Sequence, residues 1–253
     1  MINLFFISTE IFLSLSILIL LLIGVFKNKS ELFIYNFTCI MVLVGLAINI
    51  NLNPQFPIDL FNNSYKIDYF TTLIKSVILI SAFLVMLCSL NYVKQNDILK
   101  IEYPILILSS ILGMLVMVSS NDLIVFYVGL ELQSLALYVL AAFKRDNILS
   151  SESGLKYFIL SALSSGLLLY GCSLIYGFSS STNFDLIYQN SESIEYGIIF
   201  GIVFVLVGLA FKITAVGVGS ATPIPSYISA KTGTTFINMK SITVIATVNI
   251  TIG

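Results

Sequence analysis

The sequence contains little charge and neither histidine nor tryptophan. Only 10% of its 253 residues are charged, 58% are hydrophobic, and the mean hydropathy is +1.01. So few polar side chains cannot cover the surface of a water-soluble globule of this size. The composition therefore indicates a membrane protein, with the lipid bilayer as its immediate partner.

Scarcity also excludes two classes of function. Twelve Lys and Arg residues against thirteen Asp and Glu give a formal net charge of -1, so the chain has no basic face for nucleic acid. Cys39, Cys88 and Cys172 each stand alone in a different apolar run, with no histidine to complete a ligand set. The sequence thus predicts no haem, metal or iron–sulfur site and no disulfide framework, and we expect the cysteines to be small buried apolar residues.

Seven apolar runs are long enough to cross a bilayer as helices, for which about 20 residues are needed. They are Leu4 to Phe26, Leu32 to Leu52, Tyr69 to Val93, Tyr103 to Ser120, Leu123 to Phe143, Leu155 to Phe178 and Tyr196 to Val216. The first has neither a basic segment before it nor a small-residue cleavage site, so we interpret it as a retained span. The sequence predicts an all-α polytopic transmembrane bundle over residues 1–216.

Basic residues are distributed unevenly between these spans. Lys66 is the only one in the second loop, and the fourth and sixth loops have none. The first, third and fifth loops hold Lys27, Lys29, Lys94, Lys100, Lys144 and Arg145. By the positive-inside rule the odd loops face the cytoplasm or matrix, and the N-terminus lies on the opposite side.

Residues 217–253 differ in composition from the rest. They are rich in Thr, Ser and Ile, and they contain two prolines. Phe236 to Ile252 is the only eighth span they offer, and it is short, contains Lys240 and suits a strand as well as a helix. We expect a divergent tail with a weak eighth span.

Ionisable residues inside the spans are the first functional candidates, because a charge in hydrocarbon costs from about 2.5 to more than 10 kcal/mol. Glu131 lies near the middle of the fifth run, too deep to reach water. Tyr127, Ser134 and Tyr138 share its helical face, which should point into the bundle. The alternative is a protonated Glu131 that only hydrogen-bonds a neighbouring helix.

Two lysines accompany this glutamate as candidates. Lys212 lies near the end of the seventh run, on a face with Gly201 and Gly208 that allows another helix to approach closely. Lys156 lies at the start of the sixth run. For both, the alternative is a side chain that extends to the membrane interface.

Glu10 and Lys75 are weaker candidates, because each lies only about six residues inside its span. Lys75 could extend to the outer interface, and the first turn of a helix can hold Glu10. A buried Glu–Lys arrangement suits proton movement. At about 4 Å and an effective dielectric of 20 the attraction is about 4 kcal/mol, comparable with the several kcal/mol that each ion loses on leaving water.

Three segments together resemble a known family. The strings YVGLELQSLALYVLAAF, ESGLKYFILSALSSGLLLYGCSLIYG and GLAFKITAV closely resemble membrane subunit N (chain 2 in mitochondria) of NADH-quinone oxidoreductase, respiratory complex I. The likeness runs from about Met1 to Val216. It implies an antiporter-like bundle of two inverted five-helix repeats, each with a broken helix, of which this chain would supply the first part.

The resemblance also assigns roles. Glu131 matches the key glutamate of the fifth helix, Lys212 the central lysine of the broken seventh helix and Lys156 the lysine of the KYF motif. They would form a proton path driven by electron transfer from NADH to quinone. NADH, flavin, iron–sulfur clusters and quinone would belong to or lie near partner subunits of complex I, in a bacterial inner membrane or, alternatively, a mitochondrial one.

The sequence departs from this family after Lys212. An Ala-Val-Pro-Phe-His-like stretch, a Trp-containing segment and the second repeat are all missing, so the chain resembles a truncated subunit. Two alternatives to a proton-pumping subunit stay open. One is a structural or assembly remnant without transport, and the other is a subunit of a multi-subunit cation/proton antiporter.

Overall fold

The structure is a computed structural model that describes residues 2–26, 31–52, 54, 56–95, 100–189 and 196–218. Its elements, in chain order, are η1 (Ile2–Ile7), α1 (Ser8–Phe26), α2 (Glu31–Asn51), β1 (Ile58–Leu60), β2 (Tyr65–Ile67), α3 (Tyr69–Gln95), α4 (Glu102–Val118), α5 (Leu123–Ala141), α6 (Ile148–Ser179), α7 (Phe184–Gln189) and α8 (Tyr196–Val218). The expected all-α bundle is confirmed, with one small hairpin added.

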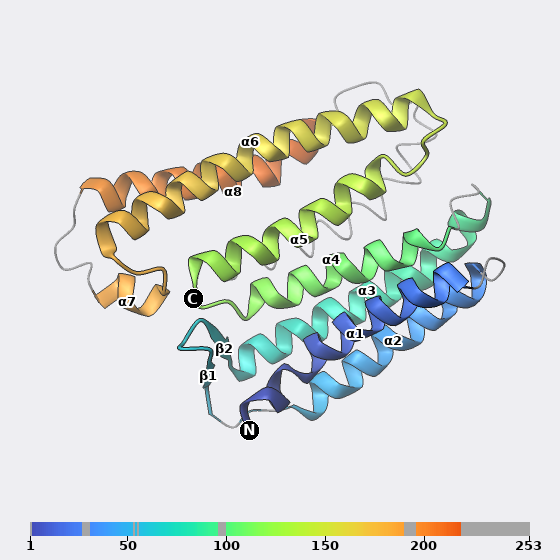
Figure 1. Ribbon diagram of the computed structural model, residues 1–253, viewed down its shortest axis with the longest axis horizontal. Helices are drawn as coiled ribbons and strands as arrows, with labels where there is room; N and C mark the ends of the chain where they lie inside the picture. Colours follow the sequence, from blue (N-terminus) through green and yellow to red (C-terminus); the bar gives the residue numbers. More distant parts are fainter. Residues whose placement is uncertain are drawn as a thin grey trace.

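The long helices run side by side (Figure 1). Helices α1, α2 and α3 lie on one side, α4 and α5 in the middle, and the paired α6 and α8 on the other side. Helices α1, α3 and α5 end, and α2, α4 and α6 begin, at one end of the bundle, and the hairpin and α7 lie at the other. The odd and even loops thus separate as the sequence predicts, and the side of the membrane that each end faces stays a prediction.

Each of the seven predicted spans corresponds to a helix. By length and composition, α2, α3, α5, α6 and the segment Phe5–Gly24 can cross a membrane, whereas α4 and the segment Tyr196–Lys212 of α8 are apolar but shorter. The sixth helix begins earlier than the predicted start of the sixth span at Leu155, so that prediction of the boundary is wrong. Asn147 caps this helix by accepting a hydrogen bond from the Leu149 amide at 3.0 Å, so α6 begins at Ile148. After Ile148 and Leu149, its first two turns consist of serine, glutamate and glycine residues, so an apolar run could not reveal them.

Close packing joins the helices in pairs. In lipid, small residues favour helix association because they let two backbones approach each other. A Cβ on Gly113 of α4 would lie 2.7 Å from the backbone nitrogen of Gln133 of α5. A Cβ on Gly208 of α8 would lie 2.8 Å from the Leu168 Cβ of α6. The glycine face predicted on the last helix therefore packs against α6.

The hairpin and α7 were not predicted, because each is too short to show a periodic pattern. Strands β1 and β2 pair antiparallel, with Leu60 opposite Tyr65. Asn62 and Asn63 form the turn at φ of 55° and 64°, the left-handed region that asparagine tolerates. The Asn63 carbonyl accepts hydrogen bonds from the side-chain amides of Asn121 at 3.0 Å and Asn183 at 2.7 Å. The hairpin is thereby joined to the α4–α5 and α6–α7 connections.

The tail lies almost wholly outside the described residues. Helix α8 continues through Gly217 to Val218, two residues beyond the predicted end at Val216. The expected eighth span, Phe236 to Ile252, falls outside the part of the chain that the structure describes.

Candidate functional site

Two of the predicted residues meet between α5 and α8. The Lys212 ammonium group donates to Glu131 Oε1 at 2.6 Å. The two side chains are 10% and 23% exposed, respectively, in the described chain. We call Glu131 and Lys212 the inner pair. An acid and a base at this distance inside a helical bundle can exchange or jointly hold a proton.

Packing between α6 and α8 positions the lysine of the inner pair. Gly208 lies one turn before Lys212 and contacts Leu168 of α6, and the Gly208 carbonyl accepts a hydrogen bond from the Ser164 hydroxyl at 2.7 Å. Because this contact leaves no room for a larger residue, α8 is held directly against α6. Lys212 can then reach across to α5.

Hydroxyl groups surround the inner pair. Ser165 of α6 donates to Glu131 Oε1, the oxygen that Lys212 also binds. Lys212 makes a second hydrogen bond, to the Ser134 hydroxyl at 3.3 Å. One turn further along both helices, the Tyr138 and Ser161 hydroxyls bond each other.

These hydroxyls form a polar seam between α5 and α6. Ser134 and Tyr138 are buried, as their place on the face of Glu131 predicts, whereas Tyr127 is only half-buried. The contact of Ser165 with Glu131 was missed. Its signal was the helical spacing of Ser161 and Ser165, which also suits plain helix packing.

The two weaker candidates also meet, at the hairpin end of the bundle. The Lys75 ammonium donates to Glu10 Oε1 at 2.5 Å, and the side chains are 2% and 6% exposed, respectively. Tyr65 of β2 donates to the same oxygen at 2.7 Å. We call Glu10 and Lys75 the hairpin-end pair. The alternative of a Lys75 side chain extended to the interface is wrong, because this side chain turns inward to Glu10.

Lys156 lies apart from both pairs. It forms an ion pair with Glu152, one turn earlier on α6, at 2.6 Å, and the two side chains are 59% and 52% exposed. Its ion pair within the described part of the chain is with Glu152 and not with either residue of the inner pair. The role that the family resemblance implies for Lys156 stays a prediction.

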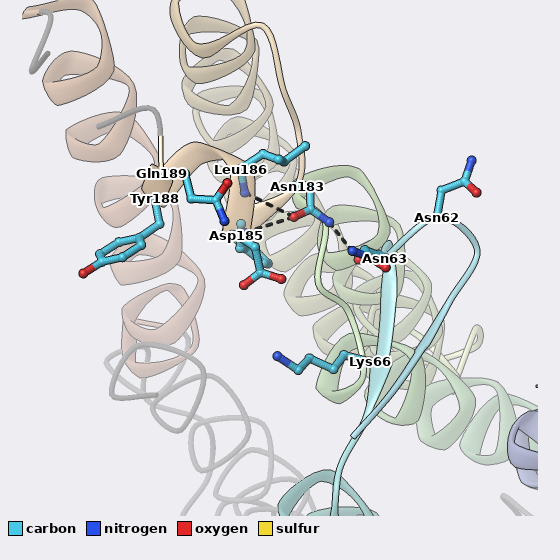
Figure 2. A pocket seen from close by; sticks show the side chains of 9 residues that line it. Asn62, Asn63, Lys66, Asn183, Asp185, Leu186, Tyr188 and Gln189 are labelled. Atoms are coloured by element: carbon cyan, nitrogen blue, oxygen red, sulfur yellow. Dashed lines mark hydrogen bonds between the residues drawn. The ribbon is translucent and has the colours of Figure 1, made fainter. Parts of the chain in front are cut away.

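A polar crevice of about 740 Å³ lies between the hairpin and α7. Figure 2 shows the Asn183 side chain at its wall, bonded to Asn63 and to backbone amides at the start of α7. Lys66 and Asp185 also line the crevice. None of the five predicted site residues lines it.

The cysteines differ in burial. Cys39 and Cys172 are buried as expected, but Cys88 of α3 is exposed, so that expectation is wrong for one of the three. The described residues contain no group of three His, Cys, Asp or Glu side chains that could hold a metal ion.

Comparison with known proteins agrees with this architecture. A family model described as the transmembrane part of NADH:quinone oxidoreductase and Mrp antiporter subunits matches residues 120–250, just over half of the chain. The chain belongs to this family. The match includes most of the segment after Val216 that we interpreted as divergent.

Curated relatives are named NADH-quinone oxidoreductase subunit N. The protein of Pelagibacter ubique is 57% identical over 214 residues, which are 85% of this chain and 45% of that protein. The protein of Rhodobacter capsulatus is 51% identical over 165 residues, 64% of this chain and 34% of that protein. This chain therefore spans less than half the length of these relatives in the matched regions.

Two solved structures have a similar fold. A chain of respiratory complex I from Thermus thermophilus with bound Aureothin matches with a TM-score of 0.68 and 25% identity, over 81% of this chain and 44% of that one. A chain of the membrane-bound sulfane sulfur reductase, an archaeal respiratory membrane complex, matches with a TM-score of 0.71. Its identity of 21% shows the fold alone. The expected antiporter-like fold is confirmed.

Proposed function

We propose that the chain is a membrane subunit of an NADH-quinone oxidoreductase and contributes to proton translocation driven by electron transfer from NADH to quinone. The inner pair, with its Lys212 to Glu131 contact of 2.6 Å, is the observation that carries this proposal. The subunit N relatives supply the reaction and the kind of assembly. The partners would be other membrane subunits, with NADH, flavin, iron–sulfur clusters and quinone in or near them, in a bacterial inner membrane.

The attraction within the inner pair and the cost of burying its two charges are of similar size. At 2.6 Å and an effective dielectric of about 20 the attraction is about 6 kcal/mol. Removal of each ion from water costs several kcal/mol, which opposes this attraction. A proton that arrives on Glu131 removes the counter-charge of Lys212, and the ammonium then releases its proton to the next acceptor.

The seam between α5 and α6 offers a route to the inner pair. A hydroxyl group both donates and accepts hydrogen bonds, so a line of hydroxyls can pass a proton by exchanging donor and acceptor roles. Ser165 bonds Glu131, and the bonded Ser161 and Tyr138 follow toward the end of the bundle that carries Lys144 and Arg145. Protons would therefore reach the pair from the basic end.

Glu131→Gln tests this function in an assembled complex reconstituted into liposomes. Glutamine keeps the shape and hydrogen bonding of the side chain but cannot ionise, so proton pumping should fall while assembly persists. Lys212→Ala should act in the same way. An unchanged ratio of protons pumped to electrons transferred in both variants would leave the inner pair a structural feature only.

An antiporter subunit is the second candidate, because the matching family includes Mrp antiporters. The two functions differ in their partners. Purification of the chain together with a quinone-reducing assembly supports the oxidoreductase, and Na⁺- or K⁺-dependent proton exchange in an assembly without that activity supports the antiporter. For either function, we propose that the chain consists of a transmembrane bundle over residues 1–216 and a tail over residues 217–253.

A further inference from the structure

The hairpin-end pair repeats the arrangement of the inner pair. In each, a lysine and a hydroxyl group donate to the same carboxylate oxygen. Lys75 and Tyr65 bond Glu10 Oε1 at 2.5 and 2.7 Å, as Lys212 and Ser165 bond Glu131. Lys75 also reaches the Tyr65 hydroxyl at 3.5 Å, whereas in the inner pair a separate hydroxyl, that of Ser134, accepts from Lys212 at 3.3 Å.

The second carboxylate oxygen of Glu10 is poised to take up a proton. Oε2 is buried and has no hydrogen-bond partner among the described residues. Since both donors converge on Oε1, a proton can bind Oε2 without breaking either hydrogen bond. The hydrogen-bond geometry therefore leaves Oε2 free to bind a proton.

A gain in the stability of the folded protein does not by itself explain why this ion pair is present. Replacing a buried ion pair by apolar side chains of similar volume is often neutral or stabilising, because burial removes both charges from water. Glu10 and Lys75 are among the most buried charged side chains of the described chain. Ionisable residues that persist at such a position in a membrane protein usually serve transport.

Access to the pair comes from the hairpin end. Glu10 lies in the first turn of α1, and Tyr65 belongs to the hairpin outside the long helices. The Ser8 and Thr9 hydroxyls beside Glu10 are buried without a partner among the described residues, and so is Asp68 Oδ1 at the start of α3. Each of these oxygens can bond a water molecule, and such waters would carry protons between the pair and the aqueous phase.

We propose that Glu10, Lys75 and Tyr65 form a second proton-binding site, which exchanges protons with the aqueous phase on the hairpin side of the membrane. Glu10 Oε2 takes a proton from water, and Lys75, which thereby loses its counter-charge, releases its ammonium proton to water in exchange. The site is therefore uncharged overall before and after the step, and the reverse exchange restores the ion pair. This inference rests on the proposed function and adds a site on α1 and α3 that is separate from the inner pair.

Tyr65 keeps the site in place through this cycle. Burial, followed by the nearby charge of Glu10, raises the pKa of Tyr65 well above its ordinary value of 10.0. The phenol therefore remains a neutral donor at physiological pH. Besides Glu10 and Lys75, the charged side chains described at this end are those of Asp59, Lys66, Asp68, Asp122 and Asp185.

The test is the paired variant Glu10→Gln with Lys75→Gln in the assembled complex, reconstituted into liposomes. Removing both charges avoids leaving one of them buried alone. We expect a loss of protons pumped per NADH oxidised that exceeds any loss of NADH oxidation. A matched control is Asp59→Asn with Lys66→Gln, which removes a cross-strand acid and base from the outer side of the same hairpin and should leave pumping unchanged.

The possible results separate this inference from the proposed function. If the paired variant assembles and pumps normally while Glu131→Gln lowers pumping, the second site is overturned and the proposed function stands. If neither change lowers pumping, both are overturned. If the paired variant does not assemble, Tyr65→Phe decides, since it keeps both charges. A ratio of protons to electrons and a pH dependence of pumping identical to those of the unaltered complex would overturn the second site.

Discussion

Gly208→Ala should weaken the inner pair without touching it. The new Cβ would lie 2.8 Å from the Leu168 Cβ, 3.0 Å from its backbone nitrogen and 3.1 Å from its Cα. Because two of these atoms belong to the backbone, no side-chain rotation can relieve the clash, and α8 must move away from α6. Overpacking of this kind costs about 1–3 kcal/mol. The hydrogen bond from Ser164 to the Gly208 carbonyl, at 2.7 Å, should lengthen as well.

The displacement carries Lys212, one turn along α8, away from Glu131. If the contact opens from 2.6 Å to about 4 Å, the attraction falls from about 6 to about 4 kcal/mol at an effective dielectric of about 20. A difference of about 2 kcal/mol corresponds to roughly a 30-fold change in an equilibrium constant. Proton pumping should therefore fall together with the thermal stability of the complex.

Gly166→Ala and Gly177→Ala are matched controls for this experiment. Both glycines lie on α6, and a Cβ at either position would meet nothing within 4 Å among the described residues. Pumping per electron and the melting temperature of the purified complex are the measurements. If Gly208→Ala matches the two controls in both, close packing of α8 does not position Lys212.

Two further predictions concern the hairpin end. Asp122→Ala removes the cap of α5, where Asp122 Oδ1 accepts from the Ile124 amide at 2.8 Å. The change should cost about 1 kcal/mol of folding free energy and lower the melting temperature. An unchanged melting temperature would show that the cap is dispensable. The raised pKa of Tyr65, caused chiefly by burial, means that the folded protein holds this proton more tightly than the unfolded chain. Its contribution to stability should be complete below pH 10 and be lost as the pH rises further, and Tyr65→Phe should flatten the melting temperature against pH in that range; equal slopes in both proteins would contradict this.

Much of the helical architecture could be predicted from local pattern. Apolar runs of about 20 residues mark spans because every buried backbone group in lipid must be satisfied within the segment. The face that joins Glu131 to Ser134 and Tyr138 follows from helical spacing alone. The starts of helices with polar first turns, such as α6, and the strands of three residues could not be predicted, since neither leaves an apolar pattern.

What the sequence by itself determined is the class of protein, its helices, the family to which it belongs and the candidate ionisable residues within its spans. The tertiary structure alone decided which of these residues meet. Glu10 and Lys75 are 65 positions apart, and the sequence treats them as two separate candidates near the ends of their spans. Lys156, a candidate by resemblance, turned out to lie on the exposed side of α6. The physical reason is that a sequence pattern determines which residues share a face of one helix. The rotation of neighbouring helices and their relative positions along the helix axis depend on packing contacts between distant segments, such as Gly208 against Leu168.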